Sequence, residues 1–232
     1  GLVDQEGAGT VTLAMTTAPT FSTIVNNAGT LLFNRPGAGS YTVAAPISDN
    51  GVGLGTVVQR GSNTVVLTGN NASYYGTLAI ANGIVQYNNL AALGSPSSVL
   101  YATNTGTLDL NNVDAGLKPI AVAGTGYTGA GAVNCTPTDT TAKYLVASLT
   151  FLGDATLGSS GRWNTKIGGS VIGNGYKLTK VGAGQIWFYG CGDIGLGDID
   201  VVSGVLGFYS PAGNPVGMGD PTKKLTIFPG AT

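Results

Sequence analysis

Residues 178–208, LTKVGAGQIWFYGCGDIGLGDIDVVSGVLGF, contain the pattern that decides the fold. They align without a gap on residues 57–87, VVQRGSNTVVLTGNNASYYGTLAIANGIVQY, at an offset of 121 residues. The coinciding glycines are Gly61 with Gly182, Gly69 with Gly190, Gly76 with Gly197 and Gly83 with Gly204. The coinciding apolar residues are Val65 with Ile186, Leu67 with Phe188, Leu78 with Ile199, Ile80 with Val201, Val85 with Leu206 and Tyr87 with Phe208. A unit of structure is therefore repeated along the chain.

A third, weaker copy of the same template covers residues 7–33. Its matching positions are Gly7, Val11, Leu13, Ile24, Gly29, Leu31 and Phe33. It departs at Asn26, which takes the position of Ile80 and Val201. The polar residue indicates either an inward polar ladder or a local slip of register.

Apolar residues alternate with polar or small ones inside each copy, which is typical of short half-buried strands. The composition agrees, because 39 of the 232 residues are glycine and only 9% are charged. We predict an all-β, right-handed parallel β-helix, or β-solenoid, forming residues 1–232 as one segment of a longer chain. Each copy is expected to stack on equivalent residues above and below it. At roughly 20–25 residues per coil and ~4.8 Å per coil, the segment would make about ten coils and a rod near 50 Å long.

Charge and residue content exclude several functions. The 10 basic and 11 acidic residues provide no basic field for nucleic acid or anionic lipid, and we expect no nucleic-acid binding. The sequence has no run of eighteen apolar residues, so we expect no membrane insertion of this segment. Histidine is absent, which removes Ser-His-Asp and Cys-His catalysis and histidine-ligated zinc. We predict a protein that is not an enzyme and carries no cofactor and no metal.

The stretch Gly173–Gly184, GNGYKLTKVGAG, followed by Ile186, Phe188, Gly190 and Gly204-Val-Leu206, resembles the autotransporter-associated β-strand repeat. In the copy at 57–87, Val57-Val-Gln59 replaces Leu-Thr-Lys. The resemblance implies a right-handed parallel β-helix in the passenger region of a secreted, autotransporter-like protein. Such a segment would be extracellular or on the outer-membrane surface of a Gram-negative bacterium. Its role would be that of a structural stalk, a scaffold or an adhesin.

Acidic residues offer an enzymatic alternative. Asp193, Asp198 and Asp200 form the tightest acidic cluster, and carboxylate pairs serve polysaccharide lyases and glycosidases on β-helices. Alternation places Asp198 and Asp200 on the outer face of a strand. They would bind calcium or a sugar there, or they would simply form a solvated surface.

Aromatic residues suggest a binding surface. Trp187, Tyr189 and Tyr209 fall at outward positions of the template, where rings can stack on sugars or contact other surface proteins. The alternative is that the longer connecting insertion at 113–160 folds over the rings and buries them. Glycans, other cell-surface proteins and self-association through the solenoid ends are the expected partners.

The cysteines leave one further question. Cys135 and Cys191 lack the spacing of a metal or redox motif, and they could form a disulfide or remain as two buried thiols.

Overall fold

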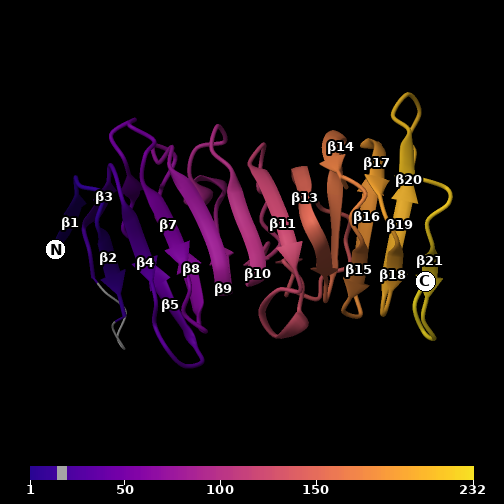
Figure 1. Ribbon diagram of the computed structural model, residues 1–232, viewed down its shortest axis with the longest axis horizontal. Coiled ribbons are helices and arrows are strands. Elements are labelled where there is room, and N and C mark those ends of the chain that lie inside the picture. Colours follow the sequence, from indigo (N-terminus) through magenta and orange to yellow (C-terminus); the bar gives the residue numbers. More distant parts are fainter. Residues whose placement is uncertain (15–19) are drawn as a thin grey trace.

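Parallel strands wind around one hydrophobic interior in the computed structural model, which describes residues 1–14 and 20–232. The molecule is elongated, with its two termini at opposite ends (Figure 1). Every strand pairing in the described residues is parallel, from β1 with β3 to β18 with β21. The all-β parallel solenoid predicted from the sequence is confirmed.

The strands form three faces of a prism. Face 1 holds β1 (Leu2–Gln5), β3 (Thr23–Asn26), β6 (Ile47–Ser48), the starts of β13 (Tyr144–Gly158) and β14 (Arg162–Ile172), β16 (Gln185–Tyr189) and β19 (Val205–Tyr209). Face 2 holds β2 (Thr10–Leu13), β4 (Thr30–Phe33), β7 (Thr56–Gln59), the starts of β9 (Thr77–Tyr87) and β10 (Leu100–Asp109), β11 (Pro119–Gly124), the middle of β13, the end of β14, β17 (Gly192–Leu196) and β20 (Val216–Gly219). Face 3 holds β5 (Ser40–Val43), β8 (Thr64–Leu67), the ends of β9, β10 and β13, and β12 (Val133–Asn134), β15 (Leu178–Val181), β18 (Ile199–Val201) and β21 (Leu225–Ile227).

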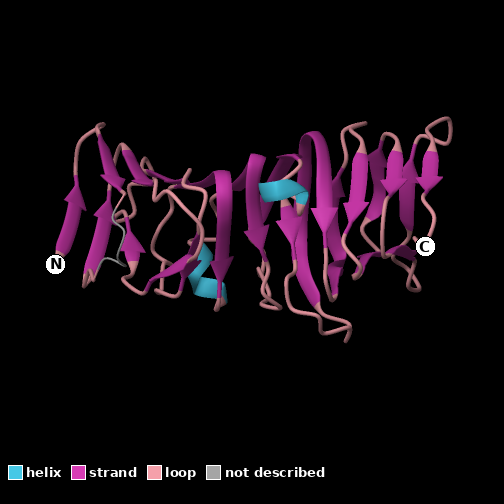
Figure 2. Cartoon of the chain, turned by 90° about the horizontal axis from the view of Figure 1, so that it is seen from below, coloured by secondary structure: helices cyan, strands magenta, loops and turns pink. Residues whose placement is uncertain are grey.

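Ten strands follow one another along face 2, so the described chain makes about ten coils. At ~4.8 Å per coil this gives a rod of about 50 Å. Two short 3₁₀ turns, η1 (Leu90–Leu93) between β9 and β10 and η2 (Tyr127–Gly129) between β11 and β12, lie apart from each other along the rod (Figure 2).

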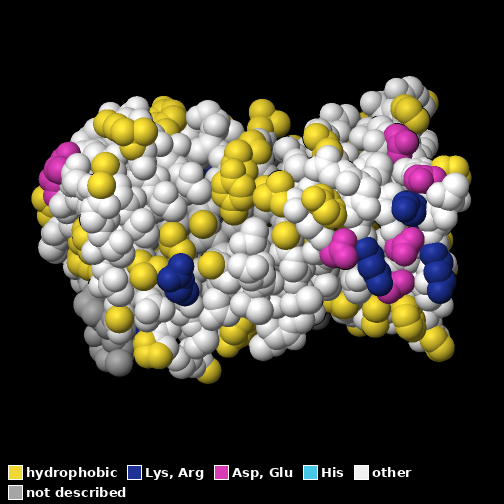
Figure 3. All heavy atoms as spheres, in the orientation of Figure 1, with side chains coloured by type: hydrophobic (Ala, Val, Ile, Leu, Met, Phe, Trp, Pro, Cys, Tyr) yellow, Lys and Arg dark blue, Asp and Glu magenta, His cyan; other side chains and the backbone are white. Residues whose placement is uncertain are grey.

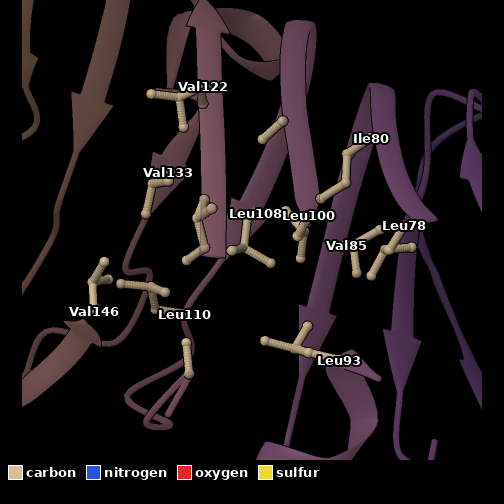
Figure 4. Close-up of a cluster of buried hydrophobic side chains, with 14 of the residues drawn as sticks. Leu78, Ile80, Val85, Leu93, Leu100, Leu108, Leu110, Val122, Val133 and Val146 are labelled. Carbon is tan, nitrogen blue, oxygen red and sulfur yellow. The ribbon is translucent and has the colours of Figure 1, made fainter. Parts of the chain in front are cut away.

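The core is a set of side-chain ladders running along the rod. On face 2, each of the following residues is the register partner of the next: Leu31, Val57, Leu78, Leu100, Ile120, Leu149 and Val171. All of them are buried. Figure 4 shows Leu78, Leu100, Leu108, Val122 and their neighbours reaching into the same interior from different strands. Alternation therefore works as predicted, with the apolar residue of each pair pointing inward.

The three copies of the sequence template lie at three different corners of the prism. The copy at 7–33 turns from face 1 to face 2, the copy at 57–87 from face 2 to face 3, and the copy at 178–208 from face 3 to face 1. The expectation that equivalent residues of the copies stack on one another is therefore wrong. The template specifies two successive turns around a corner, and any of the three corners can use it.

Two residues before the first glycine of each copy, a buried polar side chain donates hydrogen bonds to backbone carbonyl groups of the turn, and in this sense it closes the corner. Lys180 Nζ donates to the carbonyl oxygens of Val181, Gly182 and Ser203 at 2.8, 2.8 and 2.9 Å. Gln59 Nε2, at the equivalent position, donates to the carbonyls of Gly61 at 2.8 Å and Asn63 at 3.0 Å. Gln5 Nε2 donates to the Gly9 carbonyl. Among the described residues, the carbonyls of Gly61, Gly182 and Ser203 accept no backbone N–H, so the side chain is their donor. The carbonyls of Gly9, Asn63 and Val181 also accept a backbone N–H, and the side chain adds a second hydrogen bond.

Asn26 belongs to an inward polar ladder and does not mark a slip of register. Asn26 pairs with Gln5 without a slip of register, and both side chains are buried. Asn26 Nδ2 donates to the Thr56 carbonyl at 3.2 Å. In the next coil, the buried carboxylate of Asp49 accepts the backbone N–H groups of Gly51 at 3.0 Å and Tyr75 at 2.8 Å. An inward polar edge thus runs beside the apolar core.

The two cysteines do not form a disulfide. Both are buried free thiols, and the Cys135 thiol donates to Asn112 Oδ1 at 3.2 Å. Burial raises the pKa of the Cys135 thiol to about 11. Among the described residues no helix has the length and apolar character to cross a bilayer.

Candidate functional site

The predicted aromatic residues lie on the outer surface of face 1. Trp187 and Tyr189 project from β16 and Tyr209 projects from β19, alternating with the buried Ile186 and Phe188. Tyr189 and Tyr209 are register partners, and their ring centroids are 4.9 Å apart. The outward direction expected from the template is therefore correct, and the three rings are brought together.

The segment 113–160 does not cover these rings. It forms β11, η2, β12 and all of β13 within the stack, so the alternative in which this segment folds over the rings and buries them is wrong. It extends the aromatic surface instead. Tyr144, at the start of β13, packs edge-to-face on Tyr189 with a centroid separation of 5.2 Å. Tyr144, Tyr189 and Tyr209 make a continuous row, which we call the tyrosine row.

Trp187 has a different environment from the tyrosines. Its register partner is Gly207, and a Cβ on Gly207 would overlap the indole ring, so the ring lies directly on the glycine. The Arg162 guanidinium lies over the ring as well, 5.1 Å from its centroid. The indole Nε1–H donates to Gln185 Oε1 at 3.0 Å. Trp187 is consequently packed into the wall of the solenoid rather than free to stack on a ligand.

Arg162 links the packed tryptophan to the tyrosine row. Its Nη2 donates to the Tyr189 hydroxyl at 3.0 Å, and its Nε donates to Asn164 Oδ1 at 3.1 Å. These contacts fix the plane of Tyr189. Tyr209 is the open end of the row, with 49% of its surface exposed. Planar rings held in fixed orientation at a surface suit stacking on sugar rings.

The predicted acidic residues lie on another face. Asp198 and Asp200 flank Ile199 on the outside of β18, in face 3, where charged side chains gather at the C-terminal end of the molecule (Figure 3). Asp193 belongs to β17 in face 2. The three carboxylates therefore do not converge, and none of them shares a face with the tyrosine row.

Both carboxylates on face 3 already bind groups of the same chain. Asp200 forms an ion pair with Lys177 at 2.6 Å, and Asp198 Oδ1 accepts the backbone N–H of Lys224 at 2.9 Å. The hydrogen bond from Lys177 holds the pKa of Asp200 below its usual value. A general acid requires the opposite shift, so this pair has the character of a solvated surface network. No group of three or more His, Cys, Asp and Glu side chains suited to a metal ion occurs in residues 1–14 and 20–232.

Comparisons with protein-family models, with curated proteins and with solved structures find no match to this chain.

Proposed function

We propose that this chain is a structural segment of a bacterial surface protein, serving as a stalk or adhesin-type scaffold. The observation that supports the proposal is the repeated corner closed by a buried donor, at Gln5, Gln59 and Lys180. Hydrogen bonds then continue around these three corners as well as along each face. Such a rod holds its shape without a ligand and offers a protease few flexible segments.

The proposed location rests on the resemblance to the autotransporter-associated repeat. The lysine of the Leu-Thr-Lys sequence is the residue whose ammonium group closes the corner, and Gln59 takes its place in the other clear copy. The residues that define the resemblance thus include the one that has a mechanical role. We place the segment in an autotransporter-like passenger, displayed outside the outer membrane of a Gram-negative bacterium.

Labelling of whole cells tests this proposal. Antibodies raised against the purified segment should bind intact cells of the source bacterium, and proteinase K added outside the cells should remove the label. Antibodies to a cytoplasmic protein provide the control and should label only permeabilised cells. Label that appears only after permeabilisation would rule out surface display.

A second function, glycan binding, is favoured by the tyrosine row. The exposed ring of Tyr209 continues the packed rings of Tyr189 and Tyr144, and Arg162 fixes the middle ring. A linear glycan lying along the rod axis would meet one ring after another. We expect its affinity to depend on the open ring of Tyr209 rather than on Trp187, which is covered by its neighbours.

Replacing Tyr209 by alanine should weaken glycan binding about 5- to 10-fold, since one stacking contact is worth roughly 1–1.5 kcal/mol. A glycan array followed by calorimetry on the best ligand would measure this. Tyr75, exposed outside the row, provides the matched control, and Tyr75→Ala should leave the affinity unchanged. Binding that is absent from the unmodified protein, or equally affected by both changes, would contradict a glycan site at the row.

A further inference from the structure

A surface pocket of about 450 Å³ opens where the chain turns from face 1 to face 2 in the fourth to sixth coils. Its lining is almost entirely apolar and includes Leu90, Ala91, Pro96, Ala115 and Leu117. The only charged residue of the lining is Lys118. Pockets of this volume and composition are typical of small-molecule sites.

Two leucines form the open walls of this pocket. Leu117 is 72% exposed and Leu90 is 52% exposed, so both present apolar surface to the solvent at the pocket mouth. Gly116 allows Leu90 to lie close, because a Cβ there would be 2.6 Å from Leu90 Cδ1. The turn η1, which begins at Leu90, is fixed by Asn89, whose side chain accepts the N–H of Ala92 at 3.1 Å. The walls are therefore held by local structure.

Lys118 provides one polar end. The residue is only 2% exposed, and its Nζ donates to the Ser95 carbonyl and to Ser98 Oγ, both at 2.8 Å. An ammonium group has three N–H donors, so one is left over after these two bonds. No carboxylate lies within 4.0 Å of Nζ in the described part of the chain. A buried positive charge without a counter-ion is costly, and an anion beside it would be stabilised.

The ammonium group lies close behind the pocket floor. Gly94 lines the pocket, and Lys118 Nζ is 3.6 Å from the point where a Cβ of Gly94 would stand. The hydroxyls of Ser95 and Ser97 are 2.8 Å apart on the same short turn, next to Pro96 of the lining. A buried donor thus lies at one end of an apolar pocket, and the two hydroxyls flank Pro96 of its lining. Burial lowers the pKa of Lys118 to about 8, so the amine is still mostly protonated at neutral pH.

We propose that this pocket binds a small amphiphilic carboxylate, such as a medium-chain fatty acid. Its hydrocarbon tail would lie between Leu90 and Leu117. Its carboxylate would accept the remaining N–H of Lys118 and a hydroxyl of the adjacent serines. The chemistry that selects this ligand is an apolar body ending in a single negative charge, which matches the one unpaired positive charge of the lining.

Titration with decanoate and with decan-1-ol, below micelle formation, tests the proposal, with ¹⁵N chemical shifts recording where each compound binds. Decanoate should saturate one site and shift the amides of 90–95 and 115–118. It should bind about tenfold more tightly than decan-1-ol, since a charge-assisted hydrogen bond is worth ~1.5 kcal/mol or more. Lys118→Met should remove this preference, leaving the two compounds equal.

Leu117→Asp gives a second test in a side chain too exposed to be needed for folding. It should weaken binding of decanoate at least about tenfold, by placing a like charge in the pocket wall. Leu54, 71% exposed in an earlier coil and outside the pocket, is the matched control, and Leu54→Asp should bind as the unmodified protein does. Shifts that do not saturate, shifts located elsewhere, or an unchanged preference for decanoate in Lys118→Met would overturn the proposal.

Discussion

Replacing Gly83 by alanine is expected to lower the free energy of unfolding by about 2–5 kcal/mol. Gly83 has φ +70°, and a left-handed conformation costs an alanine roughly 1–2 kcal/mol. The added methyl group would also overlap the Gly61 carbonyl and stand 2.8 Å from Gln59 Nε2. Relieving such overlap in a packed interior costs a further 1–3 kcal/mol or so. Denaturant unfolding followed by far-UV circular dichroism would measure the loss.

Gly51→Ala separates the two contributions. Gly51 also has positive φ, +80°, but no atom lies within 4 Å of the position its Cβ would take. This variant should lose only the conformational part, about 1–2 kcal/mol. Equal losses in the two variants would show that the corner at Gly83 has room for a methyl group, against the close packing described above.

Much of the fold could be predicted from the sequence because its determinants are local. Alternation of apolar residues between glycines in 178–208 is enough to define short strands with one face inward, and repetition of the template indicates stacking. The inward direction of Ile186 and Phe188 and the outward direction of Trp187 follow from the same two-residue period. The direction of each of these side chains follows from its immediate neighbours in the sequence.

The face of the prism on which each copy of the template lies could not be predicted from the sequence. Which face a strand joins depends on the length of every intervening segment, and these lengths vary. β13 is 15 residues long and passes through all three faces, pairing by Val146 on face 1, Leu149 on face 2 and Leu157 on face 3. Copies with the same local pattern therefore reach different corners.

In the candidate sites, too, local features could be predicted and contacts between coils could not. The two-residue period predicts that Tyr189 and Tyr209 point outward, but it carries no information on Gly207 of the next coil, on which the Trp187 ring lies. The buried position of Lys118 is not predicted by the template, since a single lysine carries no periodic signal. The available indication was its isolation before the apolar run Pro119–Ala123, where a lysine must be buried or displaced from the strand.

Replacing Lys180 by methionine is expected to cost about 2–4 kcal/mol of stability. Methionine fills a similar volume but leaves the carbonyls of Gly182 and Ser203 without a donor, whereas the Val181 carbonyl keeps the N–H of Ser159. Each buried carbonyl left unsatisfied costs about 1–3 kcal/mol. Removing the buried charge of Lys180 offsets part of this combined cost. Chemical unfolding followed by fluorescence of Trp163 and Trp187 would report the change close to the site.

Lys180→Gln should cost less than about 1 kcal/mol, because Gln59 closes the equivalent corner with an amide. The reciprocal variant Gln59→Met should resemble Lys180→Met. If Lys180→Gln were as damaging as Lys180→Met, the corners of the two copies would not be interchangeable, and the template would have no common mechanical role.

The difference in stability between the unmodified protein and Lys180→Gln should also depend on pH. Burial lowers the pKa of Lys180 to about 8, from 10.5 in the unfolded chain. Between these values the unfolded state binds the proton more readily, so the lysine form should gain stability relative to Lys180→Gln as the pH rises, by up to about 1.4 kcal/mol per pH unit. Burial raises the pKa values of Tyr87 and Cys135, which act in the opposite direction but are common to both proteins and cancel. A difference that stays flat from about pH 7 to 9.5 would mean that the three carbonyls keep the ammonium group charged, and that hydrogen bonding outweighs desolvation at this corner.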